Sequence, residues 1–291
     1  YEEVYTKLLW IAEGVTSYYD NLFLPRCGVI SVEEYFELIG DDLGLYDKIP
    51  GKSIMSVEEA SFNAWVKLYR QNENSMNTTI SYYLAGGIIM MALDLSIRKL
   101  SCGKKSLDDV YRQLWEMFKE DGKGINKETF VKLCENTAGE SLNEIWNYLS
   151  NPIPVKLDTY LEPFGVEIIK EYSKPEYNHA SWFGVFITPK TSTVSKVIAG
   201  SPSYNAGLYA KDEIIAINKM RVDNYNTMDR LNACNLGKPS EILINRDGMI
   251  KTITMVGKKR ALDKFKLKRV ENPTDSQKSM FTQWLKCEWD A

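Results

Sequence analysis

One glutamate lies inside a run of apolar and aromatic residues near the start of the chain. Glu13 follows Trp10 and Ile11 and precedes Tyr18 and Tyr19. A carboxylate in such surroundings loses hydration, so it needs a cation, a proton or several hydrogen-bond donors as compensation. Two interpretations are open: Glu13 is an exposed helix residue with apolar neighbours, or it is a metal ligand. Spacing alone favours the first, because helical glutamates are common and metal ligands are rare.

The string Trp-x-x-Glu-Gly-x-Thr-x-Tyr-Tyr, from Trp10 to Tyr19, changes this weighting. It resembles the third-ligand helix of the glycyl aminopeptidase family of zinc metallopeptidases and, more broadly, the Asn-Glu-Gly helix of the gluzincin aminopeptidases. In those enzymes an H-E-x-x-H helix supplies two histidines and the general-base glutamate. The resemblance implies that Glu13 is the remaining zinc ligand. It places the two histidines before Tyr1, because His179 is the only histidine in the chain.

A second segment with chemical potential is Ser81-Tyr82-Tyr83-Leu84-Ala85-Gly86, which is similar to the family's Tyr-x-Lys-Gly segment. There a tyrosine donates its phenol proton to the developing oxyanion, and Tyr83 is the matching position. Ala85 stands where family members commonly have lysine. The alternative is a core tyrosine with a satisfied hydroxyl, which is the better interpretation for Tyr82. Residues 59–69 also resemble the family, but the sequence assigns them no chemical role.

The composition indicates a globular protein with room for about two domains of roughly 100–200 residues each. Hydrophobic residues make up 44% of the 291, enough for packed cores. The net charge of −3 creates no single-sign field that would attract nucleic acid or an anionic membrane. The most continuous apolar stretch, residues 85–95, is shorter than the ~20 residues of a membrane span. Five dispersed cysteines argue against a disulfide framework and leave the compartment open.

The first half of the chain predicts helices and few other elements. The expected helices are 6–26, 31–38, 56–68, 80–100, 106–118, 126–136 and 141–149, with capping boxes at Ser31 and Ser56. Residues 41–51 are expected to be a loop or a frayed segment, and residues 71–79 a loop. Gly86 and Gly87 permit close approach of another backbone. Each costs about 1 kcal/mol relative to alanine in a helix interior, so packing or function must offset this cost. Asp94 and Arg98 are expected to form a weak surface pair.

From Gly165 the pattern changes to short β-rich runs separated by turns. The expected strands are 166–169, 182–188, 194–198, 213–217, 241–245 and 251–255, with a hairpin turn at 246–248. The basic run that starts at 257 is interpreted as a solvated strand end and linker. A helix after Thr274 is expected to dock on the body of the protein through Met280, Phe281, Trp284 and Leu285.

The order of short motifs between Val197 and Asn218 resembles a PDZ domain of the bacterial, circularly permuted type. A PDZ domain binds an extended peptide as an added strand, and backbone N–H groups of a glycine-containing loop hold the terminal carboxylate. The resemblance implies that Phe183, Gly184 and Val185 form this loop and the start of the adjoining strand. Equally open is that Phe183 and Val185 are core residues and that the protein's own chain fills the groove.

These patterns predict an α+β multidomain chain. Residues 1–158 would be the helical C-terminal part of a gluzincin-like catalytic domain, 159–258 a PDZ-like domain, and 259–291 a tail with a docking helix. The resemblance implies a zinc aminopeptidase that removes glycine or alanine from the N-termini of peptides, with C-terminal peptides as further partners of the PDZ groove. Zn²⁺ is expected in the whole enzyme and not in this chain alone, because Glu13 is its only identifiable ligand. The alternative is a non-catalytic, peptide-binding scaffold.

Overall fold

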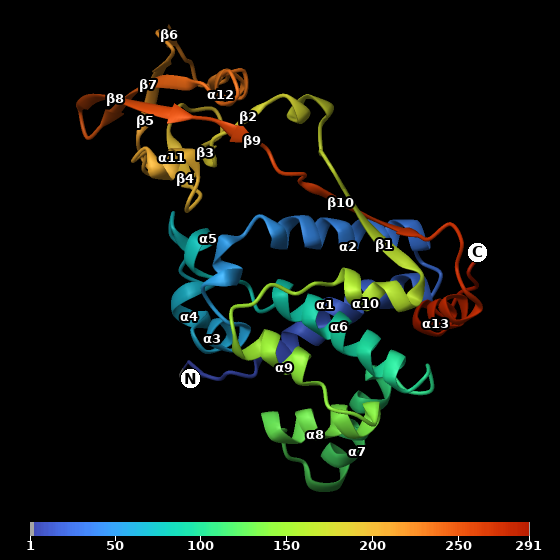
Figure 1. Cartoon of the computed structure of the whole chain (residues 1–291). Coiled ribbons are helices and arrows are strands. Elements are labelled where there is room, and N and C mark those ends of the chain that lie inside the picture. The colour runs from blue at the N-terminus through green and yellow to red at the C-terminus, as the bar shows by residue number, and fades with distance from the viewer. Residues whose placement is uncertain (1–2, 291) are drawn as a thin grey trace. The chain divides into compact units, whose positions relative to one another are not determined.

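The computed structural model describes residues 3–290, and the chain divides into two compact units (Figure 1). The helical unit comprises Tyr1–Arg70, Thr79–Ile169 and Phe265–Ala291, and the strand-rich unit comprises Gln71–Thr78 and Lys170–Lys264. These bounds differ from the expected ranges, because the C-terminal segment groups with the helical unit and a short segment near residue 75 groups with the strand-rich unit. Within residues 3–290, no helix combines the length and apolar character of a membrane span.

The helical unit is built around two long helices, α1 and α6, which cross at its centre (Figure 1). Its helices are α1 (Leu9–Arg26), α2 (Val32–Asp47), α3 (Val57–Phe62), α4 (Ala64–Lys67), α6 (Leu84–Leu100), α7 (Leu107–Asp121), α8 (Lys127–Ala138), α9 (Asn143–Ser150), α10 (Asp158–Leu161) and α13 (Asp275–Leu285), with 3-10 turns η1 (Pro50–Ser53) and η2 (Glu162–Phe164). Their buried faces form one core. β1 (Val166–Glu171) pairs with β10 (Lys264–Arg269) where the chain leaves this unit and returns.

Glycine makes the crossing of α1 and α6 possible. A Cβ added to Gly14 would lie 2.8 Å from the carbonyl carbon of Gly86, and a Cβ added to Gly86 would lie 3.0 Å from the Gly14 Cα. One turn along, a Cβ on Gly87 would lie 3.1 Å from the Ser17 Cβ. The prediction that Gly86 and Gly87 admit another backbone is therefore confirmed. The close packing of the two helices offsets the low helix propensity of these glycines.

α2 is longer than predicted. Both expected capping boxes, at Ser31 and Ser56, are present, but the prediction of a loop over 41–51 is wrong at its start, because α2 continues to Asp47. The helix tolerates Gly40 since a backbone packs against it: a Cβ there would lie 2.4 Å from the carbonyl oxygen of Phe265. The buried face also continues past this glycine through Leu43, Gly44 and Tyr46.

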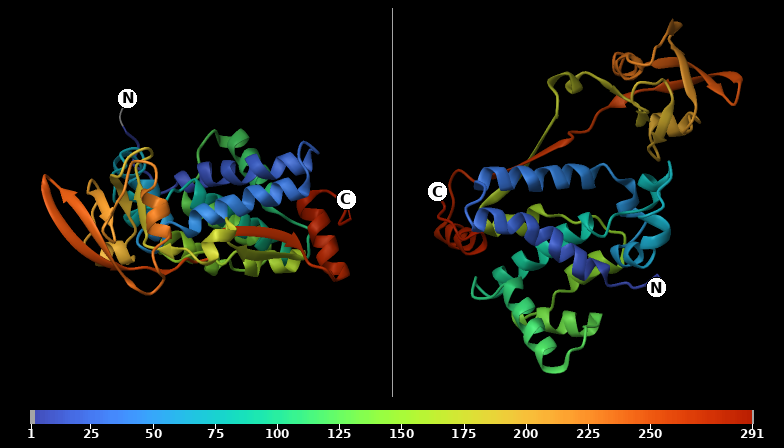
Figure 2. Two further views of the ribbon diagram at one scale, coloured as in Figure 1. Left: turned by 90° about the horizontal axis from the view of Figure 1, so that it is seen from above. Right: turned by 180° about the vertical axis from the view of Figure 1, so that it is seen from behind.

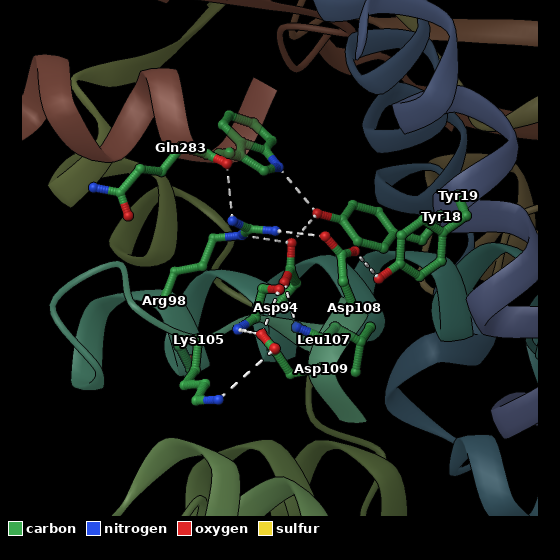
Figure 3. A network of polar contacts seen from close by, with 12 residues as sticks. Tyr18, Tyr19, Asp94, Arg98, Lys105, Leu107, Asp108, Asp109 and Gln283 are labelled. Carbon is green, nitrogen blue, oxygen red and sulfur yellow. Dashed lines mark hydrogen bonds and ion pairs between the residues drawn. The ribbon is translucent and has the colours of Figure 1, made fainter. Parts of the chain in front are cut away.

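The expected surface pair of Asp94 and Arg98 is wrong, because both side chains are buried, at 0% and 2% exposure. The Arg98 Nε donates to the Asp94 carboxylate at 2.9 Å, and the Leu107 backbone N–H donates to the other carboxylate oxygen at 2.8 Å (Figure 3). The Tyr18 hydroxyl completes the shell at 2.7 Å. Spacing alone indicates only that the pair shares a helix face. The helices packed on that face remove it from solvent.

The same network fixes the C-terminal helix α13. The Trp284 indole N–H donates to the Tyr18 hydroxyl at 3.0 Å, and Arg98 donates to the Gln283 carbonyl at 3.0 Å. A second carboxylate, Asp108, accepts from Tyr19 and pairs with Arg26 at 3.2 Å. The predicted docking stripe of Met280, Phe281, Trp284 and Leu285 is buried, and Figure 2 shows α13, in red, against the blue helices of the helical unit. The docking prediction is confirmed.

The strand-rich unit contains three small sheets. Its elements are α5 (Ser75–Thr78), η3 (Pro175–Asn178), β2 (Ser181–Trp182), β3 (Val185–Ile187), β4 (Val194–Val197), α11 (Pro202–Asn205), β5 (Glu213–Ile217), β6 (Met220–Arg221), α12 (Thr227–Asn232), β7 (Pro239–Arg246), β8 (Met249–Val256) and β9 (Lys258–Lys259). The sheets have the orders β6-β5-β7-β8, β3-β4 and β2-β9. The predicted hairpin is confirmed, with Arg246 opposite Met249. The prediction of a strand end and linker from residue 257 is wrong in part, because this segment contains the strands β9 and β10.

Residues 71–79 were also expected to be a loop, but they contain α5, which belongs to the strand-rich unit. The buried Asn77 side chain donates to the Val197 carbonyl at 2.8 Å and accepts from the Ala199 backbone N–H at 2.9 Å. Its amide therefore acts like a strand backbone at the end of β4. These two contacts tie a segment between α4 and α6 to residues more than a hundred positions later.

Candidate functional site

Glu13 and Tyr83 lie together in the helical unit. Glu13 precedes Gly14 in α1, and Tyr83 is the N-cap residue of α6, three positions before Gly86. Both side chains are half-buried. Hydrogen bonding to the Tyr69 hydroxyl, burial, and a hydrogen bond to the Glu13 carboxylate raise the pKa of Tyr83 to about 12. The phenol therefore carries its proton at neutral pH and lies beside a carboxylate that could bind a cation.

Three phenol groups meet at this point. The hydroxyls of Tyr69 and Tyr82 lie 3.4 Å apart, and the rings of Tyr82 and Tyr83 stack with centroids 4.8 Å apart. Tyr82 is a core side chain, only 1% exposed. The interpretation of Tyr82 as a core tyrosine with a partnered hydroxyl therefore fits its surroundings. Tyr69 was not predicted, and the only signal for it in the sequence was the family-like segment 59–69.

A cavity of about 440 Å³ opens beside Tyr83 between α1, α2 and α6. Its apolar wall consists of Ile39, Leu45, Ile49, Leu84, Ile88, Met91 and Leu157. Its polar part includes Ser17, Asp20, Asn21, Asp42 and Ser81. Burial and the neighbouring Asp41 raise the pKa of the Asp42 carboxyl. The site thus combines a proton donor with a largely apolar hollow, an arrangement common to small-molecule and peptide sites.

The described residues do not by themselves assemble a metal centre. Within residues 3–290, no group of three His, Cys, Asp or Glu side chains could hold a metal ion. Glu13 is nevertheless a suitable single ligand, because a half-buried carboxylate among aromatic residues gains from a cation. His179 belongs to the strand-rich unit. There it lines a hollow of about 520 Å³ with Lys174, Glu176, Tyr177, Ala180, Met228, Asp229, Asn232 and Ala233.

The expected peptide loop lies elsewhere in the strand-rich unit. The side chains of Phe183 and Val185 are core residues, 3% and 6% exposed. Gly184 has φ +71°, and a Cβ there would lie 2.2 Å from the Ser201 Cβ. β3 pairs with β4 along one edge, and no other strand within residues 3–290 pairs with it. Only backbone groups of this loop could therefore hold a peptide, whereas the two apolar side chains serve the core.

Comparison with known proteins connects the helical unit to a peptidase family. The model of the M61 glycyl aminopeptidase family matches residues 1–89. The crystal structure of an aminopeptidase N family protein from Idiomarina loihiensis matches with a TM-score of 0.85 at 30% identity, covering 98% of this chain and 49% of that chain. This chain thus spans about half the length of that relative. No curated protein matches this chain.

Matches confined to part of the chain are much weaker. The PDZ domain of a carboxy-terminal protease from Vibrio cholerae, in complex with a peptide, aligns with 29% of this chain and 97% of its own, at 18% identity and a TM-score of 0.24. A serine endoprotease from Yersinia pestis aligns with 29% of this chain and 30% of its own, at 22% identity and a TM-score of 0.26. Scores this low assign no fold to the strand-rich unit.

Proposed function

Since this chain belongs to the M61 glycyl aminopeptidase family, we propose that it supplies one zinc ligand, Glu13, and one oxyanion donor, Tyr83, to a zinc-dependent aminopeptidase. The substrates would be peptides with a small N-terminal residue, glycine or alanine. The two histidine ligands and the general-base glutamate would come from an H-E-x-x-H helix, a motif that the 291 residues do not contain. Peptide binding through the β3 edge would be a second role of the same chain.

The observation that carries this proposal is the contact of Glu13 with Tyr83, set by the glycine crossing of α1 and α6. A ligand and an oxyanion donor must both reach one substrate carbonyl, so their side chains have to converge. The two helix backbones meet at Gly14 and Gly86. Gly14 directly follows Glu13, and Gly86 lies three residues after Tyr83. This packing accounts for the proximity of the two side chains, of which Tyr83 also lines the cavity between α1, α2 and α6.

Each residue has a defined task under this proposal. When bound, zinc would polarise the scissile carbonyl and acidify a water molecule. Glu13 would hold the metal through its carboxylate oxygens. These oxygens would then no longer accept the hydrogen bond from the Tyr83 hydroxyl. Tyr83 keeps its proton at neutral pH, because its pKa is raised to about 12. It would then donate that proton in a hydrogen bond to the oxygen on which negative charge develops.

The test uses the whole enzyme, with its H-E-x-x-H helix. Glu13→Ala should remove stoichiometric zinc and the turnover of glycyl and alanyl arylamides. Tyr83→Phe should keep the zinc and lower kcat by about 10²–10³, the usual effect of losing one oxyanion donor. The exposed residues Glu37 and Tyr204 provide matched controls, as Glu37→Ala and Tyr204→Phe. Retention of zinc by the Glu13 variant would refute the ligand assignment.

The 291-residue chain alone gives an independent check. One carboxylate holds zinc too weakly to survive dilution, so the purified chain should contain no stoichiometric zinc and should not turn over the arylamides. Stoichiometric zinc together with turnover would mean that other residues form the site. The preference for small residues is tested separately, in the whole enzyme, by comparing kcat/KM for glycyl, alanyl and leucyl arylamides.

The role of the strand-rich unit requires a different assay. The unpaired edge of β3 beside Gly184 favours capture of an extended peptide through backbone groups. Peptides with a free C-terminus should bind the chain, and C-terminal amidation of the same peptides should weaken their binding. Equal affinity for amidated and free peptides would exclude the Phe183–Val185 loop as a carboxylate site. A screened peptide library without binders would favour a purely architectural role for the unit.

A further inference from the structure

The net charge of −3 hides opposite charges on the two units. The strand-rich unit, Gln71–Thr78 and Lys170–Lys264, contains 15 lysines and arginines against 10 aspartates and glutamates, a net charge of +5. The rest of the chain, the helical unit, therefore carries −8. A local excess of one sign attracts partners of the opposite sign even in a chain that is close to neutral as a whole. The basic run from residue 257 belongs to the positive unit and has no role in the proposed function.

This basic run lies next to the loop that is proposed to hold a peptide carboxylate. β9 pairs with β2, and the exposed Lys258 lies opposite Trp182 (Figure 1). A Cβ added to Gly257 would lie 3.0 Å from the Cζ of Phe183, and a Cβ added to Gly184 would lie 3.0 Å from the Cη2 of Trp182. Opposite residues of an antiparallel pair share one face. The Lys258 side chain is therefore on the face of the Trp182 ring, which itself contacts the glycine of the loop.

A second exposed lysine lies on the strand that pairs with β3. Lys196 of β4 is opposite Phe186 of β3, and both side chains are exposed. The Ile198 N–H donates to the Gly184 carbonyl at 2.8 Å. Backbone groups alternate along a strand, so those of Val185 point away from β4, to the open edge. A peptide strand added there would place every second side chain on the face that carries Phe186 and Lys196.

We propose that the strand-rich unit selects acidic peptides, with Lys258 and Lys196 pairing with carboxylate side chains near the C-terminus of a peptide bound at the β3 edge. This proposal rests on the proposed capture of peptides at that edge and adds the chemical class of the peptide. Within residues 3–290 neither lysine forms an ion pair. Their ammonium groups can therefore bind a partner without breaking an internal contact, and charge complementarity of this kind selects among partners.

The hollow beside β2 favours a peptide over a nucleic acid or another polyanion. It is lined by Ala180, the residue before β2, by Lys174 and His179, and also by Glu176 and Asp229. A nucleic-acid strand binds along a groove of positive charge, and these two carboxylates interrupt such a groove. An extended peptide needs only an open strand edge and a few local charge partners.

The test compares two labelled peptides by fluorescence anisotropy with the 291-residue chain. Both have a free C-terminus; one has several acidic residues near it, and its match has glutamine or asparagine at the same positions. The acidic peptide should bind about twofold to fivefold more tightly for each lysine that it reaches, as expected for exposed ion pairs. This preference should fade at high salt, because exposed charges are then screened.

Charge reversal locates the preference on the surface. Lys258→Glu and Lys196→Glu should each reduce it, and the double variant should favour the neutral peptide. Lys251→Glu is the matched control, because it makes the same change in net charge at the hairpin end of β8, opposite Ile244. An equal reduction by the control variant would overturn the proposal, since net charge alone would then account for the preference.

The remaining outcomes separate this proposal from the proposed function. Binding of both peptides with equal affinity would refute the acidic preference and leave peptide capture intact. Absence of binding by both would refute capture at the β3 edge and the preference with it. Tighter binding of double-stranded DNA or heparin than of the acidic peptide would assign the basic run to polyanions and overturn the proposal.

Discussion

Gly14 of α1 and Gly86 of α6 meet backbone to backbone, so closely that a Cβ on Gly14 would lie 2.8 Å from the Gly86 carbonyl carbon. The same crossing places Glu13 beside Tyr83. Packing of the helical unit and the geometry of the candidate site are therefore set by one contact. A change that separates the two helices should affect stability and the site together.

Gly14→Ala should destabilise the helical unit. The added methyl meets backbone atoms, which cannot move aside as a flexible side chain can, so the overpacking cost should be about 3 kcal/mol. Alanine recovers about 1 kcal/mol of helix propensity, which leaves a net loss of about 2 kcal/mol in the free energy of unfolding. Urea denaturation measures it. Gly124→Ala, where nothing lies within 4 Å of the added Cβ, is the control. Equal stability of both variants would disprove the close contact.

Arg98→Ala should cost about 3–5 kcal/mol, because it leaves the buried Asp94 carboxylate without its charged partner. The exposed pair of Lys119 and Glu116 gives the contrast: Lys119→Ala should change the free energy of unfolding by less than about 0.5 kcal/mol. Adding Asp94→Asn to the Arg98 variant should recover part of the loss, because the uncompensated charge is removed. A double variant less stable than Arg98→Ala would mean that the buried charge is not the source of the cost.

The stability of the helical unit should depend on pH through Asp108. Burial alone would raise the pKa of the Asp108 carboxyl, but the hydrogen bond from Tyr19 and the charges of Arg26 and Arg98 lower it below its ordinary value. A carboxyl with a lowered folded-state pKa stabilises the fold above its unfolded pKa of about 3.9, and this stabilisation is lost as the pH falls through the folded-state pKa.

The comparison of wild type with Asp108→Asn between pH 3 and pH 7 isolates this contribution. The difference in the free energy of unfolding should be constant at pH 6–7 and should shrink below about pH 4. Glu37→Gln removes an exposed carboxylate from α2 and should give a small difference without this decline. A wild-type advantage that persists unchanged at pH 3 would contradict the role of the Asp108 charge.

Asn77→Ala should loosen the strand-rich unit at one place. It leaves the buried carbonyl of Val197 and the N–H of Ala199 without this partner, at a cost of about 1–3 kcal/mol. Hydrogen exchange followed by mass spectrometry should show faster exchange in peptides covering residues 71–78 and 197–201. Asn205→Ala, at an exposed position in α11, should leave both peptides unchanged. Unaltered exchange in the Asn77 variant would mean that these contacts do not hold the segment.

Local signals in the sequence were sufficient for much of the fold. The capping boxes at Ser31 and Ser56, the hairpin turn at 246–248 and the buried stripe of the C-terminal helix all appear as predicted. Each of these features depends on residues a few positions apart, such as a serine and the glutamate three residues later. The errors have a common origin as well: α2 runs past Gly40 because a distant backbone, at Phe265, packs against it.

The candidate site divides in the same way. The string around Glu13 and the segment around Tyr83 marked two residues and the family to which they belong, because motif spacing is a property of the chain. The sequence could not place Tyr69 beside them or bury Asp94 with Arg98. Both depend on which helix faces meet, and that is decided when α1 and α6 cross at Gly14 and Gly86 and the surrounding helices exclude water. Motif spacing therefore indicated the candidate chemical groups, and tertiary packing set their partners, burial and pKa values.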